Sequence, residues 1–450
     1  MSSKLSAKIL VLALLAVALP SVAFASAARI EGLGLQGDYV MDYNNAFTYP
    51  SLVTQYQNLV YGDLGNKSLP GGDLTDFTNN NQNPRLEDAN RSMGAILGNL
   101  WGGKIGVWSV NFNENASPLS PALGAQYFNR NANEALDLLW GWKMQKTSIG
   151  LRLNKSYSSL ETGNGTVITR PFTPPGSAIT SPPDNARQLF NGLASQLGAD
   201  DWNSFGAGAG ATFTLGEGDK ASMLDVSGEL RWMSFEQSDT TGAVKFEDNG
   251  GLSYAFNARL HWEKEGDFHL MPVVNFYRLD LGTKYSSTAG LPVADTTYDN
   301  TVTGLNAGLV GNWKLRDSDW FWLGAAYEYS KIDFEDTARD PQASGALEAS
   351  YTNMPNIFAA LESSLWPWFT VRLGAGRPLF SELKANDKTT PKIETKVKDS
   401  PLQYTVGVGF HFAKLDVDAV VNQDFGFTGG WFASGNSETP FSKLSATYRW

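Results

Sequence analysis

Apolar and polar residues alternate strictly over several stretches of about ten residues in this chain. Residues 224–232 and 402–412 follow the pattern, and in residues 252–262 the apolar positions are Leu252, Tyr254, Phe256, Ala258, Leu260 and Trp262. Successive side chains of a β-strand point to opposite faces, so each stretch predicts a strand with one apolar face. This repetition restricts the chain to an all-β fold.

Weaker alternation marks the remaining strands, and the connections between strands are short and long in turn. An even strand number then gives about sixteen strands, with fourteen or eighteen as alternatives. The other strands are expected at residues 57–65, 91–100, 103–112, 134–144, 146–157, 203–215, 267–279, 301–315, 319–332, 355–365, 367–377, 414–422 and 443–450. Long loops rich in Asn, Asp, Ser, Thr, Gly and Pro are expected near residues 113–133, 158–202, 235–250, 280–300, 333–353, 378–400 and 423–440.

The last strand ends on an aromatic residue. Its apolar positions are Leu444, Ala446, Tyr448 and Trp450, with polar residues between them. This ending resembles the C-terminal signature of Gram-negative outer-membrane β-barrels. The resemblance implies a transmembrane, antiparallel, up-and-down β-barrel in the bacterial outer membrane, with short periplasmic turns and long extracellular loops. It also implies that outer-membrane lipid surrounds the barrel, and that these four residues form the signal for the barrel-assembly machinery.

The N-terminus has the pattern of a secretory signal peptide. Lys4 and Lys8 precede an apolar stretch over residues 9–19, and small residues at Ala23 and Ala25 predict cleavage after Ala25, with Ala27 as the alternative. We therefore divide the chain into a signal peptide (1–25), an N-terminal segment (26–55) and a barrel (56–450). The segment is expected to be a periplasmic tail, an extra strand pair or a plug inside the lumen.

Composition excludes several classes of protein. The formal net charge is −11, and no block of Lys and Arg offers a surface for nucleic acid. The chain has no cysteine, which rules out disulfides and thiolate metal sites. Only three histidines could act as a general base, and none sits beside a serine in a nucleophile motif, so we expect no enzyme, no cofactor and no metal. The sequence does not decide the oligomeric state, and a homotrimer is one of the states that it allows.

Polar residues of the alternating strands are expected to face the lumen. The predicted pore-lining residues carry both signs of charge, which favours small polar solutes in a wide lumen. They are Arg152, Asp225, Glu229, Arg231, Asn257, Arg259, His261, Glu328, Arg372, Asp416 and Asp418. The alternative is that these charges pair with one another and fill a narrow interior.

The architecture resembles general diffusion porins, in which a long external loop folds into the lumen. Here that loop would be residues 158–202, with a short helix at residues 185–198, and an exposed position is the alternative. Residues 29–55 also resemble the hatch of fatty-acid-transport barrels, although its Asn-Pro-Ala triplet is missing. We expect a porin-like channel for passive diffusion of hydrophilic solutes; the alternatives are a plugged channel for hydrophobic compounds and an adhesion barrel acting through its loops.

Overall fold

The structure is a computed structural model. It describes residues 26–35, 37–66, 89–98, 106–114, 134–161, 197–217, 221–239, 244–263, 267–280, 282–287, 296–299, 301–334, 347–387, 394–400, 402–422 and 440–450. The expected signal peptide lies outside the described residues, as do nearly all of the expected helix at 185–198 and the centre of loop 158–202.

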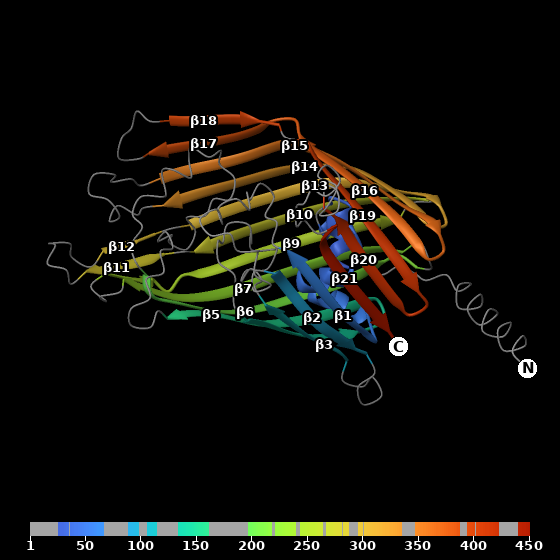
Figure 1. The fold of residues 1–450 in the computed structure, drawn as a ribbon, viewed down its shortest axis with the longest axis horizontal. Helices are drawn as coiled ribbons and strands as arrows, with labels where there is room; N and C mark the ends of the chain where they lie inside the picture. Colours follow the sequence, from blue (N-terminus) through green and yellow to red (C-terminus); the bar gives the residue numbers. More distant parts are fainter. Residues whose placement is uncertain are drawn as a thin grey trace, which may run out of the picture.

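Sixteen antiparallel strands form a closed up-and-down barrel (Figure 1), which confirms the predicted fold and strand number. The last strand pairs with the first, from Leu59 opposite Arg449 to Gly65 opposite Lys443, and closes the sheet. The barrel strands are β1 Leu59–Asn66, β2 Ala89–Leu97, β3 Val107–Glu114, β4 Glu134–Lys143, β5 Thr147–Glu161, β6 Leu197–Leu215, β7 Ser222–Asp239, β9 Leu252–Glu263, β10 Phe268–Asp280, β13 Thr301–Arg316, β14 Asp319–Phe334, β15 Leu347–Trp366, β16 Phe369–Pro378, β19 Gln403–Phe412, β20 Leu415–Val421 and β21 Phe441–Arg449.

Several of the expected long loops contain strands. The sheet continues beyond the barrel through β8 (Val244–Asp248), β11 (Thr283–Ser287), β12 (Thr296–Tyr298), β17 (Ser381–Asp387) and β18 (Glu394–Asp399). β8 pairs with β7 and β11, and β17 pairs with β15 and β18. The expectation of irregular loops was therefore wrong here. Strands were predicted from the alternation of apolar and polar residues. Neither face of these extensions needs to meet lipid, so segments such as β17 lack that alternation and were predicted as loops.

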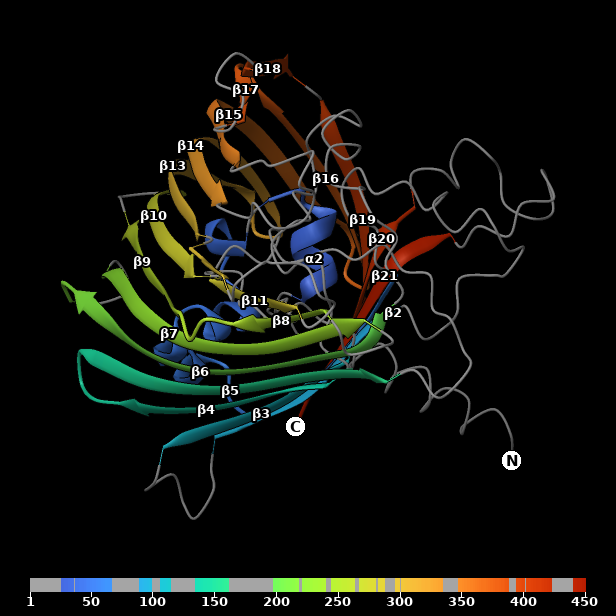
Figure 2. The same ribbon diagram turned by 90° about the vertical axis from the view of Figure 1, so that its left-hand side faces the viewer.

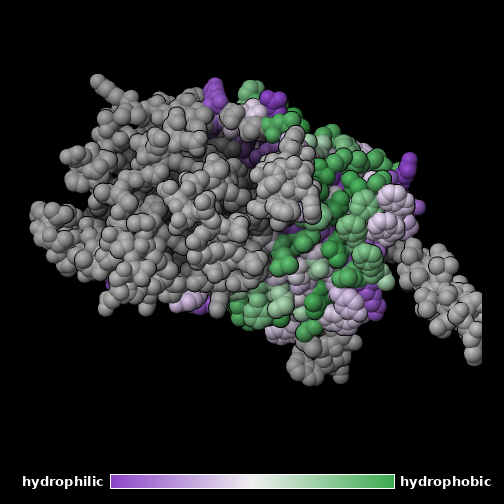
Figure 3. Space-filling model, viewed as in Figure 1, coloured by the Kyte–Doolittle hydropathy of each residue, from purple (hydrophilic) through white to green (hydrophobic). Residues whose placement is uncertain are grey.

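The outer face of the barrel is apolar. Leu151 and Leu153 on β5 and Phe256 on β9 are exposed there, alternating with buried polar neighbours. On the face seen in Figure 3, hydrophobic residues gather at the end that carries the short turns, where β1, β16 and β19–β21 lie. Such a belt fits a hydrocarbon layer, in which a closed barrel leaves no backbone group unpaired at a sheet edge. Among the described helices, none has the length and apolarity to cross a membrane.

The chain enters the interior of the barrel before its first strand. Residues 26–57, which we call the lumen segment, lie inside the curve of the sheet (Figure 2). They form four short helical elements: α2 (Ala27–Gly32), η1 (Gly37–Tyr39), η2 (Tyr43–Phe47) and η3 (Pro50–Gln55). Side chains cap the ends of these elements. Asp42, for example, is the N-cap of η2 and accepts a hydrogen bond from the Asn44 amide at 2.7 Å.

Candidate functional site

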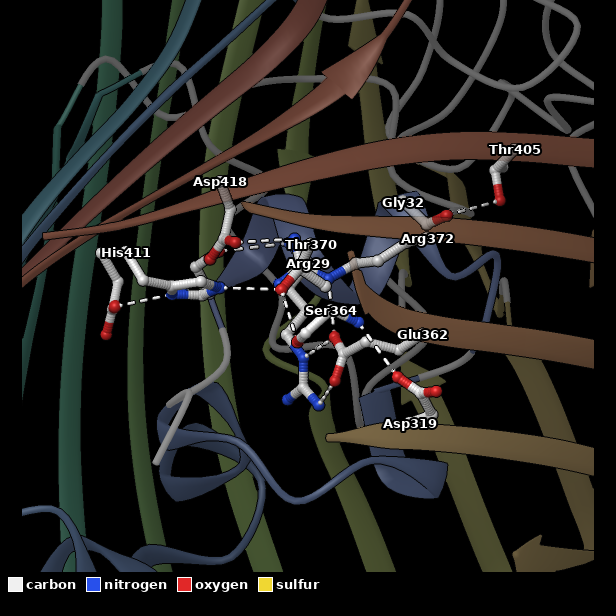
Figure 4. A network of polar contacts seen from close by, with 12 residues as sticks. Arg29, Gly32, Asp319, Glu362, Ser364, Thr370, Arg372, Thr405, His411 and Asp418 are labelled. Atoms are coloured by element: carbon white, nitrogen blue, oxygen red, sulfur yellow. Dashed lines mark hydrogen bonds and ion pairs between the residues drawn. The ribbon is translucent and has the colours of Figure 1, made fainter. Parts of the chain in front are cut away.

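Helix α2 is fastened to the wall by a buried network of charges (Figure 4). Arg29 donates two hydrogen bonds to Glu362 on β15, at 2.6 and 2.7 Å. Arg372 on β16 donates to the same carboxylate at 2.6 Å and to Asp418 on β20 at 2.7 Å. Paired two-point contacts between arginine and carboxylate are among the strongest hydrogen bonds in proteins. Glu362 therefore links the lumen segment to three strands of the wall.

A second network holds the middle of the lumen segment. Arg259 on β9 bonds Asp225 on β7 at 2.8 Å, donates to the Asp38 carbonyl oxygen at 3.1 Å, and lies 4.6 Å from the centre of the Tyr49 ring. Asn275 on β10 donates to the Asp38 carboxylate at 2.8 Å. Arg259 thus neutralises a wall carboxylate and contacts the lumen segment at Asp38, Met41 and Tyr49.

A third network of buried charges contacts η2 at Phe47. Arg152 on β5 bonds Asp137 on β4 at 2.6 Å and Glu229 on β7 at 3.2 Å, and donates to the Phe47 carbonyl oxygen at 2.9 Å. Arg231 on β7 bonds Glu229 at 2.7 Å. Since all of these charges are buried, each one needs the others to avoid a large desolvation cost.

Two apolar clusters join the lumen segment to the wall. In the first, the segment packs on inward-facing residues of β10 and β13–β15, and the Tyr39 and Phe358 rings lie 4.9 Å apart. The second links it to β1–β4. The first cluster comprises Leu33, Leu35, Tyr39, Val40, Met271, Val273, Val310, Trp322, Ala326, Phe358 and Ala360, and the second Tyr43, Ala46, Tyr49, Leu52, Val53, Tyr56, Leu59, Tyr61, Ile96, Val107 and Leu139.

Aligned glycines let η3 rest directly on the wall. Gly141, Gly150 and Gly210 are register partners on β4, β5 and β6. A Cβ added to Gly150 would lie 2.2 Å from the Pro50 carbonyl carbon, and one added to Gly141 would lie 2.4 Å from a Val53 methyl. Side chains at these positions would occupy the space that η3 fills.

We expect Gly150→Ala to displace η3 and Gly208→Ala to leave it in place. A Cβ at Gly208 would meet only wall atoms, the nearest being the Gly228 oxygen at 3.4 Å. Overpacking costs about 1–3 kcal/mol, so the docked state of the lumen segment should weaken in the first variant only. Limited proteolysis of the segment in folded, heat-modifiable barrels measures this. Equal cleavage rates in the two variants would contradict the contact.

The docking of η2 should depend on pH through Asp42. Burial raises the pKa of this carboxyl to about 7, from an ordinary value of 3.8. The released segment binds protons less readily, so docking is strongest below about pH 4 and is weakened as the pH rises to about 7. Asp42→Asn keeps the capping oxygen and should weaken this dependence, while Asp317→Asn in an exposed turn should retain it in full. Protease protection of the segment between pH 4 and 7.5 reads it out; a wild-type profile without slope would refute the assignment.

His411 takes part in a hydrogen-bonded chain near the short turns (Figure 4). Its Nδ1 lies 2.8 Å from Asp416, its Nε2 lies 3.0 Å from the Thr370 hydroxyl, and that hydroxyl lies 3.0 Å from the Ser364 hydroxyl. The order of groups is that of an acid–base–hydroxyl triad. Thr370, however, is only 2% exposed. We therefore assign these hydrogen-bonded side chains a structural role, in which they connect four strands. The lack of enzymatic activity stays a prediction.

All of the predicted pore-lining residues lie on the inner face. Glu328 is half-buried and accepts from Asn353 at 3.0 Å, Asn257 donates to Ser227 at 3.2 Å, and the Asp416 carboxylate also contacts Arg449. The others are buried, and most of them bond one another or the lumen segment. A role in lining an open pore stays a prediction. Their contacts with residues 26–57 did not follow from the alternation of the strands.

Sequence reasoning also missed Asp137, Glu362 and Asp63. Each is an acid whose two neighbours in the sequence are apolar or small, and this is the signal that could have found them. The four residues of the expected assembly signal lie on the outer face of β21 and just beyond it, with Leu444, Tyr448 and Trp450 exposed. Their recognition by the assembly machinery stays a prediction.

Comparisons with known proteins give only distant matches. No protein-family model and no curated protein matches the chain. Among solved structures, the Ralstonia pickettii toluene transporter TbuX is 10% identical with a TM-score of 0.38, over 95% of this chain and 98% of that one. A Pseudomonas aeruginosa FadL homologue is 13% identical with a TM-score of 0.39, over 95% and 99%.

The ferric yersiniabactin uptake receptor FyuA from Yersinia pestis is 10% identical with a TM-score of 0.38. The match covers 81% of this chain, which spans only 53% of that receptor. Similarity at this level assigns no family. The closed sixteen-strand sheet and its apolar outer face identify the chain as a β-barrel of the bacterial outer membrane, with a distant likeness to FadL-type barrels.

Proposed function

We propose that this protein is an outer-membrane channel that its lumen segment closes, and that its substrates are small apolar compounds. One observation carries the proposal. Residues 26–57 occupy the interior of the barrel and cover inward-facing apolar residues of the wall. This arrangement supports the plugged channel that the sequence left as an alternative to an open porin.

The apolar inner wall supports the choice of substrate. Met271, Val310, Trp322 and Phe358 face inward and are buried against the lumen segment. Exposing such residues to water costs about 25 cal/mol for each Å² of apolar surface. When the segment moves, an apolar solute can cover this wall in its place, whereas a sugar cannot.

The second candidate is a channel for hydrophilic solutes. The charged networks around Arg152 and Arg259 favour it, because they place both signs of charge on the wall of β4–β9. A polar solute would pass along that side of the lumen. Since the lumen segment contacts these networks as well, its displacement would be required in this case too.

Uptake by cells distinguishes the two candidates. We would measure entry of 1-N-phenylnaphthylamine, a hydrophobic dye, and of a hydrophilic trisaccharide into cells producing the protein. We expect the protein to accelerate dye entry, Trp322→Gln to reduce it, and Trp366→Gln, at the exposed end of β15, to leave it unchanged. Rapid trisaccharide entry with dye entry unaffected by Trp322→Gln would overturn the proposal and favour the second candidate.

A further inference from the structure

The N-terminal end of the lumen segment lies beside a row of polar residues on the wall. Ser26 is 1% exposed, and its hydroxyl donates to Asp418 at 2.6 Å. The Ala28 amide donates to the Ser445 hydroxyl at 3.0 Å, and that hydroxyl donates to Asp63. The start of α2 is therefore tied to both β20 and β21.

This row places two carboxylates on either side of one serine. Ser445 on β21 is the register partner of Asp63 on β1 and of Asp418 on β20. Neighbouring strands lie about 4.8 Å apart, so the two aspartates stand two strand spacings from each other. A small cation at the start of α2 would lie within reach of both.

The surrounding charges leave a deficit of positive charge. Glu362 and Asp418 share two cations, Arg29 and Arg372. Asp63 is buried and receives hydrogen bonds from the Ser92 and Ser445 hydroxyls, but within the described part of the chain it forms no ion pair. A buried carboxylate without a cation is costly by several kcal/mol. One further positive charge would complete the cluster.

We propose that the α-ammonium group of Ser26 is this missing cation, and that it ion-pairs with Asp418 and Asp63 to fasten the mature N-terminus inside the barrel. The group arises when water hydrolyses the Ala25–Ser26 peptide bond, the cleavage that the sequence predicts. The water oxygen goes to the Ala25 carboxylate, and the released amine of Ser26 takes up a proton. At neutral pH an α-amino group is mostly protonated, since its ordinary pKa is about 8.

Geometry supports this position of the nitrogen. The amide nitrogen of a serine lies about 3 Å from its own hydroxyl oxygen, and the Ser26 hydroxyl already contacts Asp418. The Ser26 hydroxyl also accepts from the Arg29 amide at 3.2 Å and so caps α2. Cleavage after Ala27 would remove Ser26 and lose both contacts, so the two cleavage sites make different predictions.

The test reads the chain end directly. Mass spectrometry of protein purified from outer membranes should show a chain that begins at Ser26. Periodate oxidises an N-terminal serine through its neighbouring amine and hydroxyl, so it reports whether the two groups are accessible. We expect oxidation of the folded barrel to be about tenfold or more slower than of the urea-unfolded chain.

Asp418→Asn should accelerate the oxidation of the folded barrel, while Asp416→Asn, on the same strand and bonded to His411, should not. A chain that begins at Ala28, or equal rates for folded and unfolded wild-type protein, would overturn the proposal even if Asp418→Asn fails to fold. These readouts do not involve conduction, so they hold or fail independently of the proposed channel function.

Discussion

Deleting residues 26–55 is expected to raise the single-channel conductance of the refolded barrel by about tenfold or more, because a sixteen-strand barrel without an internal segment encloses a water-filled lumen. The wall should survive the deletion. Its charged networks keep internal partners, such as Arg372 with Glu362 and Asp418. Conductance in a planar bilayer measures the effect on protein whose heat-modifiable migration shows that it has folded.

A peptide of residues 26–55 provides the control for this deletion. Added to the truncated barrel from the side of the short turns, it should reduce the conductance again, and a peptide carrying Arg29→Met should do so at much higher concentration. A truncated barrel that conducts like the full chain would contradict the assignment of the segment as the closing element.

Replacing Arg29 alone is expected to have the second-largest effect. Arg29→Met removes two buried hydrogen bonds to Glu362, while Glu362 keeps Arg372 as its partner. Breaking a buried ion pair costs about 3 kcal/mol, which corresponds to about a hundredfold shift from the docked to the released segment. The open probability of single channels should rise accordingly.

Lys443→Met is the matched control, because Lys443 on β21 contacts Glu31 of the same helix. Lys443 bonds Glu31 at 3.2 Å, but both side chains are partly exposed, and such pairs contribute at most about 1 kcal/mol. We expect little change in open probability. If the two variants behaved alike, the buried position of the Arg29 pair would have no bearing on closure.

The strands were predictable because lipid enforces a pattern on them. Where the inner face is polar, as in β9, the alternation is strict and both the strand and its inward side chains follow from the sequence. In β10 and β14 the inner face is apolar as well, because Met271, Val273 and Trp322 pack on the lumen segment. The alternation is weaker there for this reason, and the apolar inner wall could not be predicted.

The position of the lumen segment could not be derived from local patterns. Its helical elements are three to six residues long, and they depend on contacts far away in the sequence. Pro50 fits the wall only because Gly150 and Gly210 align across two strands, an alignment set by register and not by spacing. The sequence therefore left open a plug, a tail and a strand pair.

A reversible link between Ser51 and Thr212 tests the central claim, that the lumen segment must move for solutes to pass. Their hydroxyl oxygens lie 2.8 Å apart and join η3 to β6, and the chain has no cysteine of its own. Ser51→Cys with Thr212→Cys should therefore form a single disulfide. We predict that dye uptake through the oxidised variant stops and that a reductant restores it, while each single-cysteine variant transports throughout. Equal uptake by the oxidised and reduced double variant would contradict the account.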